Sequence, residues 1–302
     1  MKKLLAAIIL MTSVMACADA FEDGVAAYEK KDYKTALEKF TPLASQGDAS
    51  AQFNLGLMYG NGRGVVQDDK QAVRWYTLAA EQGDASAQLN LGVMYDEGKG
   101  VAQDYKQAVL WYTLSAEQDN ANAQVNLGSM YRKGQGVVQD YKQAVRWYTL
   151  SAEKGKADAQ LNLALMYYIG QGVVQDHKKA VQWFTLSAEQ GNASAQYNLG
   201  LMYDDGKGVV QDYKQAVRWY TLSAEQGKVD AQLNLGVMYL NGQGVLQDYV
   251  RAHMWINIAA ANGQPSGPKN RNIVAAKMNP QQIERAQQMA RDCMARNYKR
   301  CN

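Results

Sequence analysis

Two short patterns in the sequence could supply a serine nucleophile. Residues 151–154 (Ser-Ala-Glu-Lys) and 266–269 (Ser-Gly-Pro-Lys) match Ser-x-x-Lys, the pattern in which penicillin-interacting enzymes place their reactive serine. Those enzymes also carry Ser-Asp-Asn and Lys-Thr-Gly companions, and the sequence contains neither. The first match is one copy of a Ser-Ala-Glu segment that recurs along the chain. We therefore interpret both matches as coincidental and predict no catalytic residues.

The other residues that could do chemistry are few. His177 and His253 lie far apart, without a cysteine or carboxylate cluster at ligand spacing, so the sequence predicts no metal site and no cofactor. Residues 60–64 (Gly-Asn-Gly-Arg-Gly) resemble a phosphate cradle, but we interpret them as a turn in which glycines supply left-handed backbone angles. The chain has 32 basic and 29 acidic residues without a basic stripe, so the sequence predicts no nucleic-acid partner.

The first 20 residues are predicted to be a signal peptide. Lys2 and Lys3 precede an uncharged run at 4–15, and residues 18–20 (Ala-Asp-Ala) match a cleavage site with the cut after Ala20. The protein is therefore expected to be exported, either periplasmic or secreted, with no transmembrane segment after cleavage. In the alternative interpretation, residues 14–17 (Val-Met-Ala-Cys) form a lipobox and the protein is a lipoprotein anchored at Cys17.

The number of cysteines agrees with cleavage after Ala20. The cut would remove Cys17 and leave Cys293 and Cys301, an even pair. Oxidising conditions favour a disulfide between two such residues in an exported protein. The alternative is two unrelated thiols in a terminal tail. The sequence predicts the disulfide, which would tie down the C-terminus.

The six tryptophans of the chain recur every 36 residues. A fixed period of this length indicates a solenoid or a propeller, and the lack of alternating β-branched runs argues against propeller blades. The sequence therefore predicts an all-α solenoid of antiparallel helix pairs. The tryptophans, interpreted as packing anchors of its core, are Trp75, Trp111, Trp147, Trp183, Trp219 and Trp255.

Residues 84–119 show how one unit would fold. Asp84 is placed to cap a first helix, residues 98–100 (Gly-Lys-Gly) would end it, and Asp104 would cap a second helix. Gly92 would let a neighbouring helix approach closely. The predicted organisation is a signal peptide at 1–20, a capping helix pair at 21–47, six repeats at 48–263, and a C-terminal segment at 264–302. That last segment is expected to contain a linker at 265–268, a short helix near 273–277 and a final helix from residue 280.

The unit resembles a known repeat. Residues 87–95 (Ala-Gln-Leu-Asn-Leu-Gly-Val-Met-Tyr), followed by Gly98, Gly100, Val101, Asp104, Ala108 and Trp111, are similar to the Sel1-like repeat, a relative of the tetratricopeptide repeat. The resemblance covers residues 48–263 in six copies. It implies a right-handed α-solenoid that binds other proteins, often in exported bacterial proteins.

The resemblance also sets the functional alternatives. We expect a non-catalytic interaction scaffold that is monomeric and binds a protein or peptide. Some relatives are periplasmic regulators of envelope signalling, which is the first alternative. A cysteine-rich subgroup is associated with β-lactam binding or hydrolysis, so a hydrolase acting on β-lactams or peptidoglycan is the second alternative. This chain lacks the disulfide that each repeat of that subgroup carries.

A candidate binding face follows from the positions that differ between copies. In the first helices these positions are spaced by three, four and three residues, which places them on one helical face. We infer that this face lines the inner, concave side of the solenoid. It contains an apolar row and ends in a mixed rim. The apolar row is Phe53, Leu89, Val125, Leu161, Tyr197 and Leu233, and the rim is Gly60, Asp96, Arg132, Tyr168, Asp204 and Leu240.

Two interpretations of the apolar row remain open. It could receive a peptide, helix or loop of a partner, or it could pack between adjacent first helices as part of the core. The rim is expected to be exposed, so charge reversal at Asp96, Arg132 and Asp204 should weaken partner binding without lowering stability. The Gln52 and Asn54 positions, unchanged in every copy, are interpreted as groups with internal hydrogen-bond partners.

Overall fold

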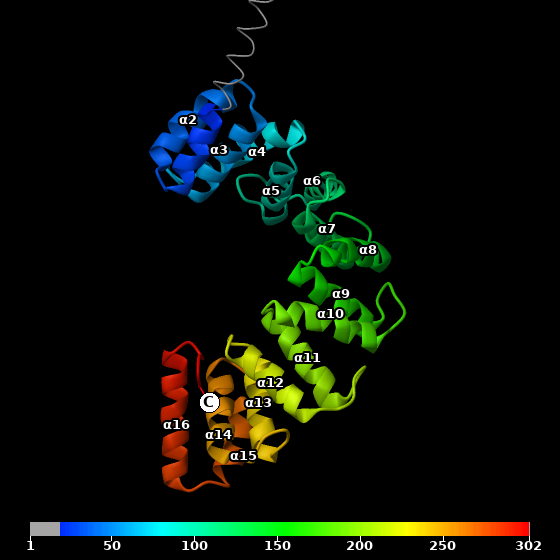
Figure 1. Ribbon diagram of the computed structural model, residues 1–302, viewed down its shortest axis with the longest axis vertical. Helices are drawn as coiled ribbons and strands as arrows, with labels where there is room; N and C mark the ends of the chain where they lie inside the picture. The colour runs from blue at the N-terminus through cyan, green and yellow to red at the C-terminus, as the bar shows by residue number, and fades with distance from the viewer. Residues whose placement is uncertain (1–18, 302) are drawn as a thin grey trace, which may run out of the picture. The chain divides into compact units, whose positions relative to one another are not determined.

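The computed structural model describes residues 19–301, and all of their regular secondary structure is helical. The predicted signal peptide, apart from Asp19 and Ala20, lies outside the described residues, as does the alternative lipidation site at Cys17. A helix at 19–29 comes first. The helices that follow are α2 (Tyr33–Ser45), α3 (Ala49–Asn61), α4 (Asp69–Glu81), α5 (Ala85–Glu97), α6 (Tyr105–Glu117), α7 (Ala121–Lys133), α8 (Tyr141–Glu153), α9 (Ala157–Ile169), α10 (His177–Glu189), α11 (Ala193–Asp205), α12 (Tyr213–Ala224), α13 (Val229–Asn241), α14 (Tyr249–Ala261), α15 (Gly267–Ala275) and α16 (Pro280–Ala295) (Figure 1).

Residues 19–147 and 148–301 form two compact units, and each is built of helix pairs. In the first unit, α3 packs on α4 and α5 packs on α6, while α4 and α6 also contact the first helix of the next pair. In the second unit, the pairs are α9 with α10, α11 with α12, and α13 with α14, linked in the same way. The predicted fold class, an all-α solenoid of antiparallel helix pairs, is confirmed.

The helix ends follow the signals found in residues 84–119. Asp84 Oδ1 accepts a hydrogen bond from the backbone N–H of Ala87 at 2.7 Å, so α5 begins where predicted. Gly98 ends α5 with φ +69°, a left-handed conformation that suits glycine. Asp104 Oδ1 accepts hydrogen bonds from the first turn of α6. These polar caps define one helix pair from local sequence alone.

Two repeats lack the first cap without losing the helix. Lys156 and Lys228 stand where Asp84 stands, and neither side chain caps the helix that follows. Even so, α9 and α13 each have 13 residues, like α5. Packing of the pair therefore fixes the helix boundaries where the cap is missing.

A glycine in the first helix brings the paired helices into close contact. Gly92 lies against the ring of Tyr112, and a Cβ at this position would be 2.6 Å from the ring. Gly56, Gly200 and Gly236 meet the second helix of their own repeats in the same way. Ala164 replaces this glycine in one repeat and is fully buried, so the fold accommodates one methyl group there. The close approach predicted for Gly92 is confirmed.

We expect Gly92→Ala to lower the free energy of unfolding by about 1–3 kcal/mol, because the new methyl group would overlap the ring of Tyr112. The matched control is Gly60→Ala in α3, where the new Cβ would meet Ala72 Cβ at an ordinary 3.5 Å. The control should be neutral or stabilise the protein by up to about 1 kcal/mol, since alanine restricts the unfolded chain. Urea denaturation of both variants checks this, and equal losses would contradict the close-contact argument.

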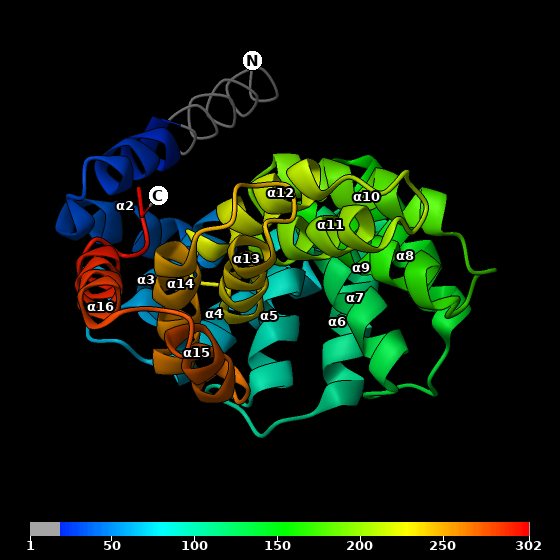
Figure 2. The same cartoon turned by 90° about the horizontal axis from the view of Figure 1, so that it is seen from below.

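The C-terminal helices cover α14. In both views, α15 and α16 lie against α14 (Figures 1 and 2). The sequence prediction for α15 was wrong at its start, because the helix begins at Gly267 inside the expected linker. Pro268 is compatible with this start, since the first turn of a helix needs no donor from that position. The predicted start of the final helix at Pro280 is correct, with Asn279 as its capping residue.

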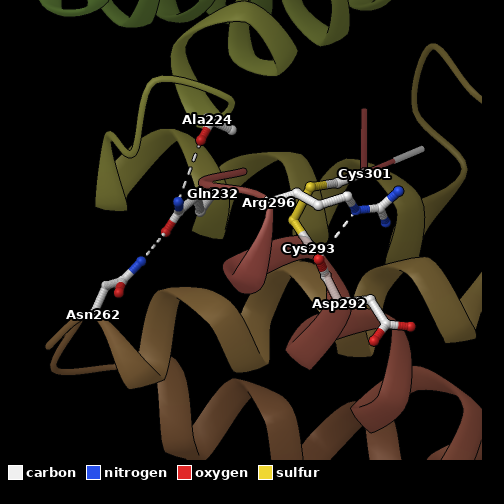
Figure 3. Close-up of a disulfide and its surroundings, with 7 residues drawn as sticks. All are labelled: Ala224, Gln232, Asn262, Asp292, Cys293, Arg296 and Cys301. Carbon is white, nitrogen blue, oxygen red and sulfur yellow. Dashed lines mark hydrogen bonds between the residues drawn. A yellow bond between two sulfur atoms is a disulfide. The ribbon is translucent and has the colours of Figure 1, made fainter. Parts of the chain in front are cut away.

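The structure joins Cys293 and Cys301 in a disulfide (Figure 3). Cys293 is fully buried and Cys301 is 5% exposed, and both pack into the cluster that contains Trp255. Tyr298, between the two cysteines, donates a hydrogen bond from Oη to Asn262 Oδ1 at 3.0 Å. The disulfide therefore fastens the segment after α16 to that helix, and packing of the cysteines together with the Tyr298 hydrogen bond holds the segment against the last helix pair.

His253 is a buried titratable group of this region. It is 2% exposed in α14, at a position where the five preceding repeats have valine. Burial lowers the pKa of His253, and the positive charge of Arg271 lowers it further. The folded state therefore favours the neutral imidazole more strongly than the unfolded chain does.

Because its pKa is lowered on folding, His253 should destabilise the protein as the pH falls through the unfolded value near 6.5. We expect the unfolding free energy to decrease between pH 7 and pH 5, and His253→Val to reduce that decrease. Urea denaturation of both proteins at the two pH values measures the difference. Identical pH dependence in the variant would show that folding does not lower the pKa of His253.

Candidate partner-binding face

The apolar row of the first helices is half-buried throughout. Phe53 and Tyr197 each place a ring beside a tyrosine of the paired helix, with ring centroids 6.1 Å from Tyr76 and 6.0 Å from Tyr220. Leu161 and Leu233 also pack against buried clusters. Each side chain of the row therefore packs partly against the core and keeps part of its own surface accessible. Core packing and partner binding, the two interpretations of the row, are thus compatible. Contact of this row with a partner stays a prediction.

The rim is half-buried as well, which differs from the exposure expected from the sequence. The phenol of Tyr112 donates a hydrogen bond to Asp96 Oδ2 at 3.3 Å, and that of Tyr220 donates to Asp204 Oδ2 at 3.1 Å. Burial raises the pKa of Asp204, and burial together with the nearby carboxylates raises the pKa of both tyrosines. These rim carboxylates therefore help to hold their own helix pairs together.

Other repeats use the rim position differently. The ring of Tyr168 lies 5.2 Å from the ring of His177, and Lys207 Nζ lies 3.5 Å from Tyr168 Oη. Leu240 packs against the C-terminal core cluster. Arg132 is half-buried. The rim thus presents acidic, basic, aromatic and aliphatic groups on equivalent backbone positions.

The sequence predicted that charge reversal at the rim would not lower stability, and this prediction needs correction at Asp204. We expect Asp204→Arg to lower the unfolding free energy by about 1–3 kcal/mol, because it removes the acceptor of Tyr220 and leaves a buried phenol without that partner. Asp205→Arg is the matched control, since Asp205 is an exposed residue paired with Lys207 at 2.9 Å. Surface pairs of this kind contribute under about 1 kcal/mol. Equal melting temperatures of the two variants would show that the hydrogen bond from Tyr220 to Asp204 adds nothing to stability.

A buried glutamine in the first helix bridges successive pairs. Gln88 Nε2 donates to the backbone O of Ala80 in α4 at 3.1 Å, and Gln88 Oε1 accepts from Gln118 Nε2, just after α6, at 2.8 Å. At Gln232 the same two bonds join the backbone of α12 to Asn262 (Figure 3). Because these amides hold internal partners, they are structural groups, as predicted.

The structure also bears on the possible nucleophile at Ser151 and on metal and membrane sites. Ser151 is fully buried in α8, so it is not exposed as a nucleophile. Its counterpart Ser115 donates a hydrogen bond to the backbone O of Ala85 at 2.6 Å. Within residues 19–301, no group of three His, Cys, Asp or Glu side chains could hold a metal ion. In the same part of the chain, no helix is long and apolar enough to cross a bilayer.

A pocket that the sequence did not predict opens at the rim end of the face. It has a volume of about 260 Å³ and is lined by residues of α3, α4 and α5 and of the loops that follow α3 and α5. Two departures from the repeat pattern line it, Gly60 at the rim and Asp69 at the start of α4. Both departures were visible in the sequence. The later repeats have a larger side chain at the rim and an aromatic ring in place of Asp69, namely Tyr105, Tyr141, His177, Tyr213 and Tyr249.

Paired helices repeated at a fixed interval, with a buried amide bridge between pairs, define the chain as an α-solenoid repeat protein. The Sel1 repeat profile matches six consecutive segments, and the chain belongs to the Sel1 repeat family. Repeats of this family mediate protein–protein interaction, and the fold commonly serves as an interaction scaffold. The matched segments are residues 49–84, 85–120, 121–156, 157–192, 193–228 and 229–264.

Solved structures are similar to this chain. The crystal structure of a Sel1 repeat protein from Oxalobacter formigenes shares 34% identity and a TM-score of 0.73, covering 80% of this chain and 96% of that chain. A protective antigen of uropathogenic Escherichia coli strains, displaying an SLR fold, is 28% identical with a TM-score of 0.46, covering 97% of this chain and 95% of that chain. No curated protein matches the sequence.

Proposed function

We propose that this protein is an exported, non-catalytic scaffold that binds a protein or peptide through the apolar row and the rim. One observation carries the proposal: on this face the side chains change from repeat to repeat while the helix frame beneath them is constant. Because the helices keep their bounds whichever residue occupies these positions, the positions can vary for recognition. Because the face is formed before binding, little conformational entropy would be lost on association.

Export is the second part of the proposal. It is supported by the disulfide between Cys293 and Cys301, since such bonds persist in oxidising compartments. The signal peptide predicted from the sequence agrees with it. Either a periplasmic or a secreted protein, or one anchored at Cys17, would present the same binding face.

The functional alternatives differ in what they would require of the structure. A periplasmic regulator of envelope signalling would use the same face, with a signalling protein as the partner. A β-lactam or peptidoglycan hydrolase would need an accessible nucleophile, and burial of Ser151 argues against the first Ser-x-x-Lys match, at residues 151–154, as its source. The scaffold proposal needs only the surface described above.

Photo-crosslinking in intact cells tests the binding face. We expect benzoylphenylalanine at Leu89 or Tyr197 to give discrete adducts with one partner, because both positions are half-buried on the proposed face. The matched control is the same probe at Leu110, which is 48% exposed on the second helix of its repeat. Adducts are measured by gel shift and identified by mass spectrometry.

The comparison between positions decides the outcome. Adducts at Leu89 and Tyr197 but not at Leu110 would support the face. Adducts at Leu110 that are as strong or stronger would contradict the proposed face and indicate that the partner binds the second helices. Circular dichroism of each variant confirms that the probe has not disturbed the helices.

A further inference from the structure

The pocket between α3 and α5 exists because two side chains are small. In the repeats that begin at Asp84 and Asn192, the rim residues Asp96 and Asp204 fill the corresponding place and accept a hydrogen bond from a tyrosine of the second helix. Gly60 leaves this place open above Tyr76 Oη, which would lie 3.7 Å from a Cβ at Gly60. The repeat therefore has the phenol without the rim carboxylate, and the space is available to a ligand.

The second small residue changes the charge of the pocket. Asp69 brings a carboxylate to the wall where other repeats have an aromatic ring. Glu97 and Lys99 also line the pocket and pair with each other, with Glu97 Oε2 2.6 Å from Lys99 Nζ, so the three charged groups together carry the charge of one carboxylate. The hydrogen bond from Lys99 to Glu97 raises the pKa of Lys99, and the more distant Asp69 charge adds to this. Among the described residues, Asp69 has no cation within salt-bridge distance. One carboxylate in the pocket is thus left without a direct partner.

The neutral groups of the pocket also suit a donor. Asn61 Nδ2 donates to the backbone O of Leu57 at 2.8 Å, which leaves Asn61 Oδ1 as an acceptor. Leu57, Val93 and Met94 form an apolar wall beside these acceptors. A pocket with an apolar wall and acceptors at its polar end matches a long side chain that has a methylene stem and a cationic head.

We propose that this pocket binds a lysine or arginine side chain of the protein partner. The stem would pack on Leu57 and Val93, and the ammonium or guanidinium would donate to the Asp69 carboxylate and to Asn61 Oδ1. The assignment rests on the proposed function, because the side chain belongs to the partner of the scaffold. It adds an anchor of defined chemistry at the first repeat.

Titration with short blocked peptides tests the pocket without the native partner. The probes are acetyl-Gly-Arg-Gly-amide, its lysine counterpart and a citrulline counterpart, which keeps the shape of arginine without its charge. The signal is the ε-methyl resonance of Met94 in methyl-labelled full-length protein, because Met94 lines the pocket. We expect saturable shifts with arginine or lysine at millimolar concentration and at least tenfold weaker binding of citrulline.

Two variants separate charge in the pocket from charge on the surface. Asp69→Asn keeps the shape of the wall and should weaken binding of the cationic peptides about tenfold. Glu81→Gln removes a charge from the exposed end of the same helix, outside the pocket, and should change binding less than twofold. Asp69→Tyr, which installs the residue of other repeats, should narrow the pocket and abolish the shifts.

The result that overturns the proposal is also defined. Absent shifts, equal binding of citrulline, or unchanged binding by Asp69→Asn would each reject a cation pocket. Crosslinking at Leu89 is independent of the pocket, because Leu89 does not line it. Adducts at Leu89 without peptide binding would support the scaffold proposal and reject the cation pocket. Peptide binding without adducts would support the cation pocket and reject the proposed binding face.

Discussion

The buried glutamine bridge is the interaction on which the repeated architecture depends. Each bridging amide is at least nine-tenths buried and contacts the end of the preceding second helix, and at Gln88 and Gln232 it also contacts the end of its own second helix. Loss of one bridge would leave several polar groups without partners in the protein interior, which costs more than the bonds themselves contribute. The bridge therefore fixes how one helix pair sits on the next. The close contact between Gly92 and Tyr112 then fixes the spacing within the pair.

The constant frame explains why the variable face can be diverse. The same backbone positions carry Gly60 and Asp69 in one repeat and the ring pair Tyr168 and His177 in another. Because the frame is held by glutamine, glycine and buried aromatic residues, these exchanges alter the surface without altering the helices. Each repeat can thus contribute a different contact to a partner, and the order of repeats in the chain sets the order of contacts.

Local signals in the sequence predicted the helices well, and contacts between helices were predicted less well. Asp84, Gly98 and Asp104 act within a few residues of their own position, so each helix end could be predicted from its neighbours in sequence. The half-burial of the rim depends on residues of the paired helix, such as Tyr112 for Asp96, and exposure was wrongly predicted there. The pocket arises from what Gly60 and Asp69 lack, and a search for chemically active residues passes over missing side chains. The start of α15 was wrong because Pro268 was interpreted as a linker residue, although a first helical turn accepts it.

The glutamine bridge has an evolutionary consequence. Among the described residues, the Gln88 side chain hydrogen-bonds to the end of the preceding second helix and to Gln118 just after its own second helix, so this bridge joins neighbouring repeats. Duplication or loss of a whole segment would therefore join surfaces that share the donor bond from the buried glutamine to the preceding second helix. Recombination between such similar segments could change the length of the array in single steps. The number of contact positions offered to a partner would change with it, while each junction kept its donor bond from the buried glutamine.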